Sequence, residues 1–498
     1  MKEHKKESLN QIIKFRIDKL NEIRNANINP YPYSYQRSHH IVDLIKNNKI
    51  LINTVVSIAG RVISMRKMGK AAFFNIQDFD GKIQIYVKKD NLPENIYDDV
   101  VRKIDIGDII GTSGELFYTK TEELSIRSKE FTILTKSIRP LPNLKEKDGK
   151  TFFSFDDKEL RYRKRHLDLI ANFKSKDVFV KRSLIINSIR QYLNNNAFIE
   201  VETPILQPLY GGANAKPFKT YHNTLGQNLY LRIADELYLK RLIVGGLEKV
   251  YEIGKNFRNE GMDKNHNPEF TMLEFYKAYS NLDDMISLTE SLIKDVAKKI
   301  EKNLKFDFNS NVIDLSKKIQ KYDFYSILNE KSGENFEQIE TTRIRTILNK
   351  NKVSIGKNSN RGKLLDKAFS FFVEGELIQP TFVLNYPIEL SPLAKKSKNN
   401  DDLVERFELF IGGMEIANAF SELNDPIDQR KRLEQQSKLR DLGDDEAQTL
   451  DFDFIESIEN GMPPTGGVGL GIDRLVMILT SQSSIKDVIL FPAMRQEE

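Results

Sequence analysis

The residues best suited to chemistry lie between Asn256 and Tyr276, where the sequence reads NFRNEGMDKNHNPEFTMLEFY. Residues 249–260 and 268–277 have the pattern of two strands, with the Gly- and Pro-bearing GMDKNHNP as their loop. Because side chains alternate between the faces of a strand, this hairpin places a cation, an aromatic ring and several carboxylates toward one side. These residues are Arg258 and Glu260 on the first strand, and Phe270, Met272, Glu274 and Tyr276 on the second. A surface hairpin with solvated charges is the alternative.

A second polar pattern lies at 405–425, in ERFELFIGGMEIANAFSELND. A hairpin centred near Ile411 and Gly412 would place Glu408 and Glu415 opposite each other, with both carboxylates on one face. Two such carboxylates repel, and a shared Mg²⁺, which prefers oxygen ligands, would relieve that repulsion. Exposed glutamates that need no partner are the alternative.

The glycine-rich run GGVGLGIDRLVMIL at 466–479 superficially resembles a dinucleotide-binding fingerprint. No βαβ unit follows it, so that interpretation fails. The glycines instead permit close approach of the backbone, and Arg474 is expected on the first turn of an apolar helix. Helix polarity at that end favours an anion.

Three motifs carry a family resemblance. FRNEG, followed by a loop and HNPEFTMLEFY, resembles motif 2 of the class II aminoacyl-tRNA synthetases, and in its details that of the lysyl-tRNA synthetases. IEVETPIL, with Pro204, resembles motif 1, and the run at 466–479 resembles motif 3. A helix followed by an edge strand that proline terminates is the plainer interpretation of the first motif. The motifs stand in the family's order, and the resemblance covers nearly the whole chain.

The resemblance implies a lysine–tRNA ligase with ATP as a substrate. Such an enzyme converts L-lysine and ATP to lysyl-adenylate and pyrophosphate, then transfers lysine to the 3′ end of tRNA(Lys). It also implies a homodimer joined through motif 1. As cofactor it implies Mg²⁺, more than one ion per subunit, with Glu408 and Glu415 as the metal-binding pair.

The resemblance also assigns roles at the ATP site. Arg258 and Arg474 are the catalytic residues: Arg258 contacts the α-phosphate and the substrate carboxylate, and Arg474 contacts the γ-phosphate of a bent ATP. Phe270 stacks under adenine. The remaining ATP-binding residues are Glu260, His266, Asn267 and Gly471.

A lysine pocket follows from the same resemblance. Glu236 holds the α-amino group, while Glu274, Tyr276 and Glu422 bind the ε-ammonium. The charges agree, because a buried ammonium needs carboxylates and a hydroxyl acceptor, and a neutral or acidic amino acid would leave these groups unpaired. The remaining residues of the pocket are Gly212, Arg258, Asn418 and Phe420.

One position departs from the family pattern. Bacterial members often carry a basic residue just before the motif 2 histidine, and here that residue is Asn265. The departure puts one phosphate contact in doubt. His266 and Lys264 are the candidates to compensate.

The N-terminal part reads as a nucleic-acid-binding barrel. A helix is expected over 3–25, within a lead-in at 1–54, and five strand-like runs with a helical stretch after the third match an OB-fold at 55–140. Asp80-Gly81 is a strong hairpin signal between the second and third runs. One of two adjacent strand residues, Phe73 and Phe74, must point away from the core. The candidate anticodon contacts are Arg66, Phe73 and Gln84.

The rest of the chain reads as a linker and a second domain. Residues 141–160 are charged and Gly-containing, and the class II catalytic domain is expected over 161–498, with a helical insertion at about 283–380. The predicted fold class is α+β, with the barrel followed by a mixed, mainly antiparallel sheet flanked by helices.

Composition narrows the setting. The chain has no cysteine, which excludes disulfides and thiolate zinc sites, and its six histidines are scattered, so any metal must be held by oxygen. No apolar run approaches the roughly 20 residues needed to span a bilayer, and the charged start does not resemble a signal peptide. We therefore expect a soluble cytoplasmic protein with no membrane partner.

Two alternatives remain open at this point. A related enzyme could attach lysine to a translation factor, but such paralogues lack the anticodon-binding domain that residues 55–138 indicate. A degenerate paralogue kept for RNA binding would have lost Arg258, Arg474 or the glutamates, and all of them are present.

Overall fold

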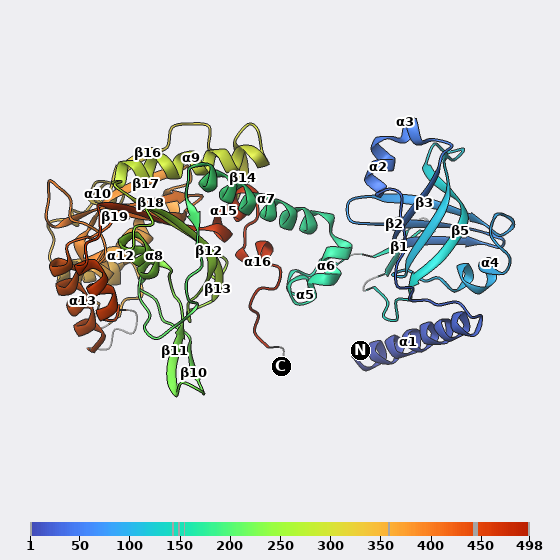
Figure 1. The fold of residues 1–498 in the computed structure, drawn as a ribbon, viewed down its shortest axis with the longest axis horizontal. Helices are drawn as coiled ribbons and strands as arrows, with labels where there is room; N and C mark the ends of the chain where they lie inside the picture. Colours follow the sequence, from blue (N-terminus) through green and yellow to red (C-terminus); the bar gives the residue numbers. More distant parts are fainter. Residues whose placement is uncertain are drawn as a thin grey trace. The chain divides into compact units, whose positions relative to one another are not determined.

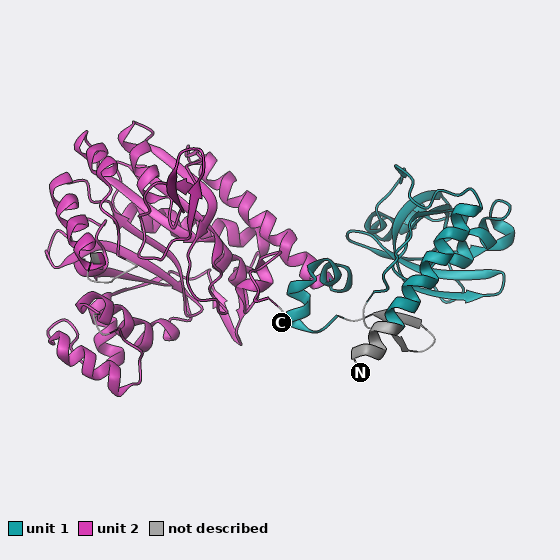
Figure 2. Cartoon of the chain, turned by 90° about the horizontal axis from the view of Figure 1, so that it is seen from below, with its two compact units in different colours: residues 1–172 teal, residues 173–498 magenta. Residues whose placement is uncertain are grey.

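A computed structural model describes residues 2–141, 144–147, 150–153, 155–356, 359–441 and 447–496. The chain divides into two compact units, residues 1–172 and 173–498, shown in separate colours in Figure 2. The boundaries predicted from sequence remain predictions, and parts of the predicted linker at 141–160 lie outside the described residues. Each unit is described by itself.

The first unit is built on a closed five-stranded barrel in the order β1-β2-β3-β5-β4. Its strands coincide with the five expected runs, and β2 and β3 pair antiparallel across Asp80-Gly81 as expected. Three short helical segments, η1 (Lys89–Asn91), α4 and η2, follow β3, so the OB-fold prediction is confirmed. The elements are β1 (Val55–Met68), β2 (Ala71–Gln77), β3 (Lys82–Lys88), α4 (Ile96–Asp99), η2 (Val101–Lys103), β4 (Ile109–Tyr118) and β5 (Leu124–Thr135).

The N-terminal helix α1 (Lys2–Asn25) is held to this barrel by polar contacts. Arg16 donates to the backbone oxygens of Ile106 (3.0 Å) and Ser137 (2.9 Å). Lys19 pairs with Asp105 at 2.7 Å. The other elements of the unit are α2 (Ile41–Lys46), α3 (Asn48–Leu51), β6 (Leu144–Lys147), β7 (Lys150–Phe153), α5 (Lys158–Arg163) and α6 (Arg165–Ala171).

The second unit is organised around an eight-stranded sheet in the order β16-β17-β18-β19-β20-β13-β12-β8. All neighbours are antiparallel except the pairs β16–β17 and β12–β8. The sheet brings together segments far apart in sequence, since β13 lies between β12 and β20. Its strands are β8 (Ile199–Glu200), β12 (Lys249–Phe257), β13 (Glu269–Ala278), β16 (Gln320–Asp323), β17 (Thr381–Pro387), β18 (Leu403–Ile411), β19 (Met414–Ser421) and β20 (Thr465–Gly471).

Helices cover this sheet on both faces, as Figure 1 shows, so the α+β prediction is confirmed. The main core joins the sheet to α7 (Phe173–Asn195), α9 (Leu282–Ile300), α15 (Ile472–Leu479) and α16 (Ile485–Val488). Helix α7 contributes Ile185, Ile189 and Leu193, which recur at helical spacing and are fully buried. Helix α8 (Glu236–Val244) packs through Leu239 and Ile243 in a separate cluster with β12 and β13.

The segment expected as a helical insertion is more varied than predicted. Between 283 and 380 lie α10 (Phe324–Ser332), α11 (Thr341–Lys350) and α12 (Arg361–Phe372), but also β14 (Lys305–Phe308), β15 (Asn311–Asp314) and β16. Helix α9 belongs to the main core and β16 is an edge strand of the sheet. The segment is therefore partly integral to the domain.

The remaining elements are a small sheet, two helices and the two 3-10 helices η3 (Glu374–Glu376) and η4 (Ile388–Leu390). The sheet has the order β10-β11-β9, from β10 (Lys219–His222), β11 (Gln227–Leu231) and β9 (Leu206–Gln207). The helices are α13 (Pro426–Asp441) and α14 (Phe452–Glu459). Among the described residues, no helix combines the length and the apolar character needed to cross a membrane.

Candidate active site

One cavity of about 380 Å³ gathers the residues singled out in the second unit. Every predicted ATP- and lysine-binding residue lines it, although the segments that supply them are spread from residue 212 to residue 474. Of the predicted metal pair, only Glu415 lines it. The sheet order explains the convergence, because β13, β19 and β20 are adjacent strands.

The motif 2 hairpin forms, but its first strand ends at Phe257, so the prediction that Arg258 and Glu260 lie on that strand is wrong. Strands β12 and β13 pair antiparallel, with Asn256 opposite Phe270, and Arg258 comes directly after β12. The backbone N–H of Arg258 donates to Pro268 at 2.9 Å, and its guanidinium lies 5.1 Å from the centre of the Phe270 ring. Phe270, Met272, Glu274 and Tyr276 all line the cavity, as strand alternation requires.

Two arginines make one end of the cavity cationic. Arg474 lies on the first turn of α15, where it donates to the backbone oxygen of Glu415 at 2.7 Å and contacts His266 Nε2 at 3.0 Å. Burial lowers the pKa of Arg258, but a guanidinium stays charged in proteins. Among the described residues, its buried Nε has no hydrogen-bond partner. This end can therefore accept an anion.

The opposite end is rich in carboxylates. Glu274 accepts hydrogen bonds from the Tyr276 hydroxyl (3.0 Å) and from the backbone N–H of Asp235 (3.2 Å). Burial raises the pKa of Glu274 well above its ordinary value, and nearby Asp235 and Glu236 raise it further. Burial also raises the pKa of Glu422 to about 8, although Lys240 opposes the shift. The site therefore holds more buried carboxylates than cations and favours a positively charged ligand.

Sequence reasoning missed Lys240 in this site. Its side chain is fully buried, and Nζ pairs with Glu236 Oε1 at 2.5 Å and with Glu422. Burial alone would lower the pKa of Lys240, but the two glutamates outweigh burial and raise it. The spacing of Glu236 and Lys240, four residues apart on one helix, was the available signal.

Glycines let the backbone approach these side chains closely. Gly212 has φ +85°, and a Cβ there would lie 3.1 Å from the Cβ of Glu236. A Cβ on Gly467 would overlap both the Glu422 carboxylate and the Tyr276 ring. Gly471 ends β20 and precedes α15, so it sets the entry to the turn that carries Arg474.

The prediction that Glu408 and Glu415 lie opposite each other is wrong. The turn of the β18–β19 hairpin is Gly412-Gly413, and a bulge between Leu409 and Phe410 shifts the register. Glu408 therefore pairs with Asn418, and Glu415 pairs with Phe410. A bulge adds one residue to one strand of a pair, and the alternation of polar and apolar residues in the sequence did not indicate it.

The two glutamates nevertheless interact. Burial raises the pKa of Glu408 to about 8, Arg406 opposes the shift, and Glu415 adds to it. Glu408 accepts from the Tyr386 hydroxyl at 2.8 Å and from Arg406 at 2.5 Å. Glu415 has 38% of its side chain exposed and lies 3.5 Å from Arg474. As a metal-binding pair, they remain a prediction.

The loop that contains Asn265 is ordered by Asp263. This carboxylate accepts from the backbone N–H groups of Asn265 (2.7 Å) and His266 (2.8 Å) and contacts His266 Nδ1 at 2.9 Å. The contacts aim the other ring nitrogen of His266 at Arg474. Asn265 also lines the cavity. Compensation by His266 stays a prediction.

A second hollow lies on the barrel of the first unit, and the three predicted anticodon residues line it. The ring centres of Phe73 and Tyr86 lie 5.0 Å apart, with the rings tilted. The neighbouring Phe74 is fully buried, so one of the two phenylalanines does point away from the core. Gln84 donates to Glu123 at 2.8 Å and accepts from Ser125 at 3.0 Å. Tyr86, Phe117, Glu123 and Arg127 complete this face and were not predicted.

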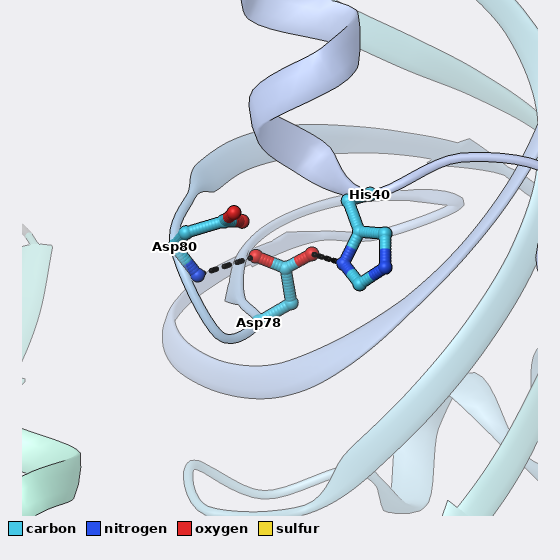
Figure 3. A group of neighbouring side chains, drawn as sticks. All are labelled: His40, Asp78 and Asp80. Atoms are coloured by element: carbon cyan, nitrogen blue, oxygen red, sulfur yellow. Dashed lines mark hydrogen bonds and ion pairs between the residues drawn. The ribbon is translucent and has the colours of Figure 1, made fainter. Parts of the chain in front are cut away.

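Among the described residues, one trio has the spacing of a possible metal site: His40, Asp78 and Asp80, shown in Figure 3. Its geometry is explained by backbone contacts. Asp78 accepts from the N–H of Ile41 (2.9 Å) at the start of α2 and from Gly81 (2.9 Å) in the β2–β3 turn. His40 lies 3.9 Å from Asp78. The trio holds a helix start against a turn, so we assign it no metal.

Comparisons with known proteins agree with this arrangement. Residues 157–495 match the family model for tRNA synthetases class II (D, K and N), and residues 56–134 match that for an OB-fold nucleic acid binding domain. The chain is 46% identical over 493 residues to a lysine–tRNA ligase of Carboxydothermus hydrogenoformans, which covers 99% of each chain. It is also 46% identical over 492 residues to one of Porphyromonas gingivalis (strain ATCC 33277), covering 97% of this chain and 85% of the relative.

Proposed function

Because the chain belongs to the class II tRNA synthetase family of D, K and N enzymes, we propose that it is a lysine–tRNA ligase. The observation that carries the proposal is the polarity of the cavity. Arg258 and Arg474 lie near Gly471, with Glu415 beside them, and the buried Glu274, Tyr276 and Glu422 lie farther along β13 and β20, near Gly467 and Gly469. ATP and lysine match these two ends.

The cationic end suits a triphosphate. Arg258 would bind the α-phosphate and the substrate carboxylate, and Arg474 would bind the γ-phosphate. Phe270 offers a ring for adenine, with Glu260, His266, Asn267 and Gly471 around it. Among the described residues, the buried Nε of Arg258 has no hydrogen-bond partner. This supports the assignment, since a guanidinium group binds phosphate and carboxylate through several donors.

The acidic end suits an amino acid with a second ammonium group. Glu236 would hold the α-amino group, and Glu274, Tyr276 and Glu422 would bind the ε-ammonium. Two substrate ammonium groups supply the positive charge that the pocket lacks. Aspartate or asparagine would leave buried carboxylates unpaired, at a cost of about 1–3 kcal/mol for each lost partner. Lysine is therefore favoured.

The first step needs no general base, because the lysine carboxylate is already ionised. One of its oxygens attacks the α-phosphorus of ATP, the bond to pyrophosphate breaks, and lysyl-adenylate forms. Arg258 would stabilise the charge that develops on the phosphate, and fixed orientation supplies most of the remaining acceleration. In the second step a ribose hydroxyl at the 3′ end of tRNA attacks the lysyl carbonyl, and AMP leaves.

The proposal includes Mg²⁺. Glu415, partly exposed at the cavity, and Glu408 behind it form an all-oxygen donor set whose mutual repulsion a cation would relieve. When bound, the ion would neutralise phosphate charge. To bind the ion, Glu408 would have to use a carboxylate that already accepts hydrogen bonds from Arg406 and Tyr386.

tRNA(Lys) is the proposed partner of the barrel. Its half-buried aromatic face, with Gln84 and Arg127 beside it, has the stacking and hydrogen-bonding groups that single-stranded bases need. This surface favours tRNA over a protein acceptor of lysine. Because tRNA charging serves translation, the proposal places the protein in the cytoplasm.

A homodimer is also proposed. Motif 1, the helix α7 before it and Leu209 just after it expose several aliphatic side chains, each at least 42% accessible: Val180, Leu184, Ile199, Ile205, Leu206 and Leu209. Apolar exposure concentrated in this way is typical of a protein interface. A second copy of the chain is the proposed occupant, since motif 1 builds the dimer in this family.

The decisive test is ATP–pyrophosphate exchange with each amino acid, followed by charging of total tRNA. We expect exchange with lysine alone and transfer of lysine to tRNA(Lys). Exchange with aspartate or asparagine but not lysine would overturn the proposed specificity. Exchange with lysine that leaves every tRNA uncharged would point to another acceptor.

A further inference from the structure

Lys240 is a buried cation placed between two recognition groups of the cavity. Its side chain is 0% exposed, and Nζ pairs with Glu236 at 2.5 Å and with Glu422, whose side chain is also 0% exposed. Glu236 is on the same helix, one turn earlier, whereas Glu422 follows β19. One ammonium thus ties together two segments far apart in sequence.

The ammonium has little freedom to move. It lies 5.3 Å from the centre of the Phe420 ring and 5.9 Å from that of Phe454. Helix α8 itself is also anchored by Arg241, which pairs with Asp451 at 2.8 Å. Lys240, which does not itself line the cavity, is therefore held in place behind Glu236 and Glu422.

We propose that Lys240 is a positioning residue that fixes the distance between the carboxylates for the two amino groups of the substrate. The proposal rests on the function proposed above, in which Glu236 binds the α-amino group and Glu422 the ε-ammonium. Because one ammonium holds both carboxylates, neither can follow a shorter substrate without breaking an ion pair. Lys240 thereby contributes to selection of the amino acid by chain length.

The charges of the pocket are consistent with this role. Glu236, Glu274 and Glu422 carry three negative charges when all are ionised, and Lys240 supplies one positive charge. A lysine substrate supplies two more, while Arg258 pairs with its carboxylate. Arg232 pairs with two other buried acids: its Nε lies 3.1 Å from Asp235 Oδ1, and its Nη1 lies 2.5 Å from Glu252 Oε1. Lysine and Lys240 together would therefore match the three charges of Glu236, Glu274 and Glu422.

The test compares Lys240→Met, which keeps the length of the side chain without its charge, with Lys240→Arg, which keeps the charge in another shape. The matched control is Arg241→Met, which removes the neighbouring cation of the same helix and its contact to Asp451. Each variant is measured in ATP–pyrophosphate exchange for the KM of lysine, the KM of ATP, and the preference for lysine over ornithine. Melting temperatures record folding.

For Lys240→Met we expect the lysine KM to rise about tenfold or more, the effect of losing one charged hydrogen bond, with the ATP KM changed less than about twofold. The preference for lysine over ornithine should fall by about tenfold. Lys240→Arg should keep a lysine KM closer to that of the parent enzyme but still relax the preference. Arg241→Met should lower the melting temperature without changing the preference.

Several outcomes would overturn the proposal. A lower lysine KM in Lys240→Met would mean that Lys240 competes with substrate, and equal losses for lysine and ATP would mean a purely structural role. If Lys240→Met does not fold, Lys240→Arg decides, and an unchanged preference contradicts the proposal. Failure of the parent enzyme to exchange with lysine would instead refute the proposed function.

Discussion

Gly467 lies so close to Glu422 that a methyl group on the glycine would overlap the carboxylate. The same methyl group would also overlap the ring of Tyr276. Both side chains belong to the proposed ε-ammonium site. The missing side chain at Gly467 therefore leaves room for both groups of the proposed site.

We predict that Gly467→Ala raises the lysine KM about tenfold or more, since overpacking of this kind costs about 1–3 kcal/mol. The KM of ATP should change less. Gly469→Ala, two residues along the same strand, is the matched control, because its nearest neighbour would be Met272 Cε at 3.4 Å. Exchange kinetics and melting curves test the pair. A similar lysine KM in both variants would contradict the steric role of Gly467.

Lysine affinity should depend on pH. The pKa of Glu422 is raised to about 8 and that of Glu274 well above its ordinary value, so the free pocket holds a proton near neutral pH. Lysine keeps its ε-ammonium charged below its pKa of about 10.4, and its binding requires ionised carboxylates, so binding releases that proton. The lysine KM should fall as pH rises from about 6 to about 8, then level off.

The KM of ATP provides the internal control for this pH dependence. It should stay nearly constant over the same range, because Arg258 and Arg474 do not titrate there. Exchange rates measured at each pH give both constants. A lysine KM that stays constant or rises as pH rises would contradict the inference that the free pocket holds a proton and that lysine binding releases it.

The barrel and the cavity should be separable by mutation. Phe73→Ala or Gln84→Ala should reduce charging of tRNA(Lys) by about fivefold or more, since base stacking is worth about 1–3 kcal/mol. Lysine-dependent exchange should remain intact. Tyr33→Ala, which removes a fully exposed aromatic outside the barrel hollow, is the control. Equal loss of charging and exchange would indicate misfolding instead.

The proposed dimer surface makes a prediction about assembly. Replacing Val180 and Leu184 on α7 with aspartate should convert the dimer to a monomer, because burying two unpaired carboxylates in an apolar interface is unfavourable. Ile427→Asp on α13 is the control, since Ile427 is 81% exposed and lies outside motif 1. Analytical ultracentrifugation measures whether each variant is a dimer or a monomer. Dimers that persist in the double variant would place the interface elsewhere.

Local patterns predicted most of the elements. The five barrel strands, helix α7 and the β12–β13 hairpin form within a few residues of the predicted bounds. These segments have strong alternation or helical periodicity and clear turn residues, such as Asp80-Gly81. The register of β18 and β19 was predicted wrongly for two reasons: the turn is Gly412-Gly413 rather than Ile411-Gly412, and a bulge between Leu409 and Phe410 shifts the pairing by one further residue without changing the residue pattern.

The sequence by itself pointed to the groups proposed for the chemistry, since the resemblance of its motifs to those of the class II synthetases names Arg258, Phe270 and Arg474 before any fold is known. Only the tertiary structure decided which side chains balance the charges of the buried glutamates in the cavity. Lys240, which pairs with Glu236 on its own helix, also pairs with Glu422, which follows β19 and is far away in the sequence. Such pairings depend on strand order and burial, and neither is encoded in the local pattern of any one segment.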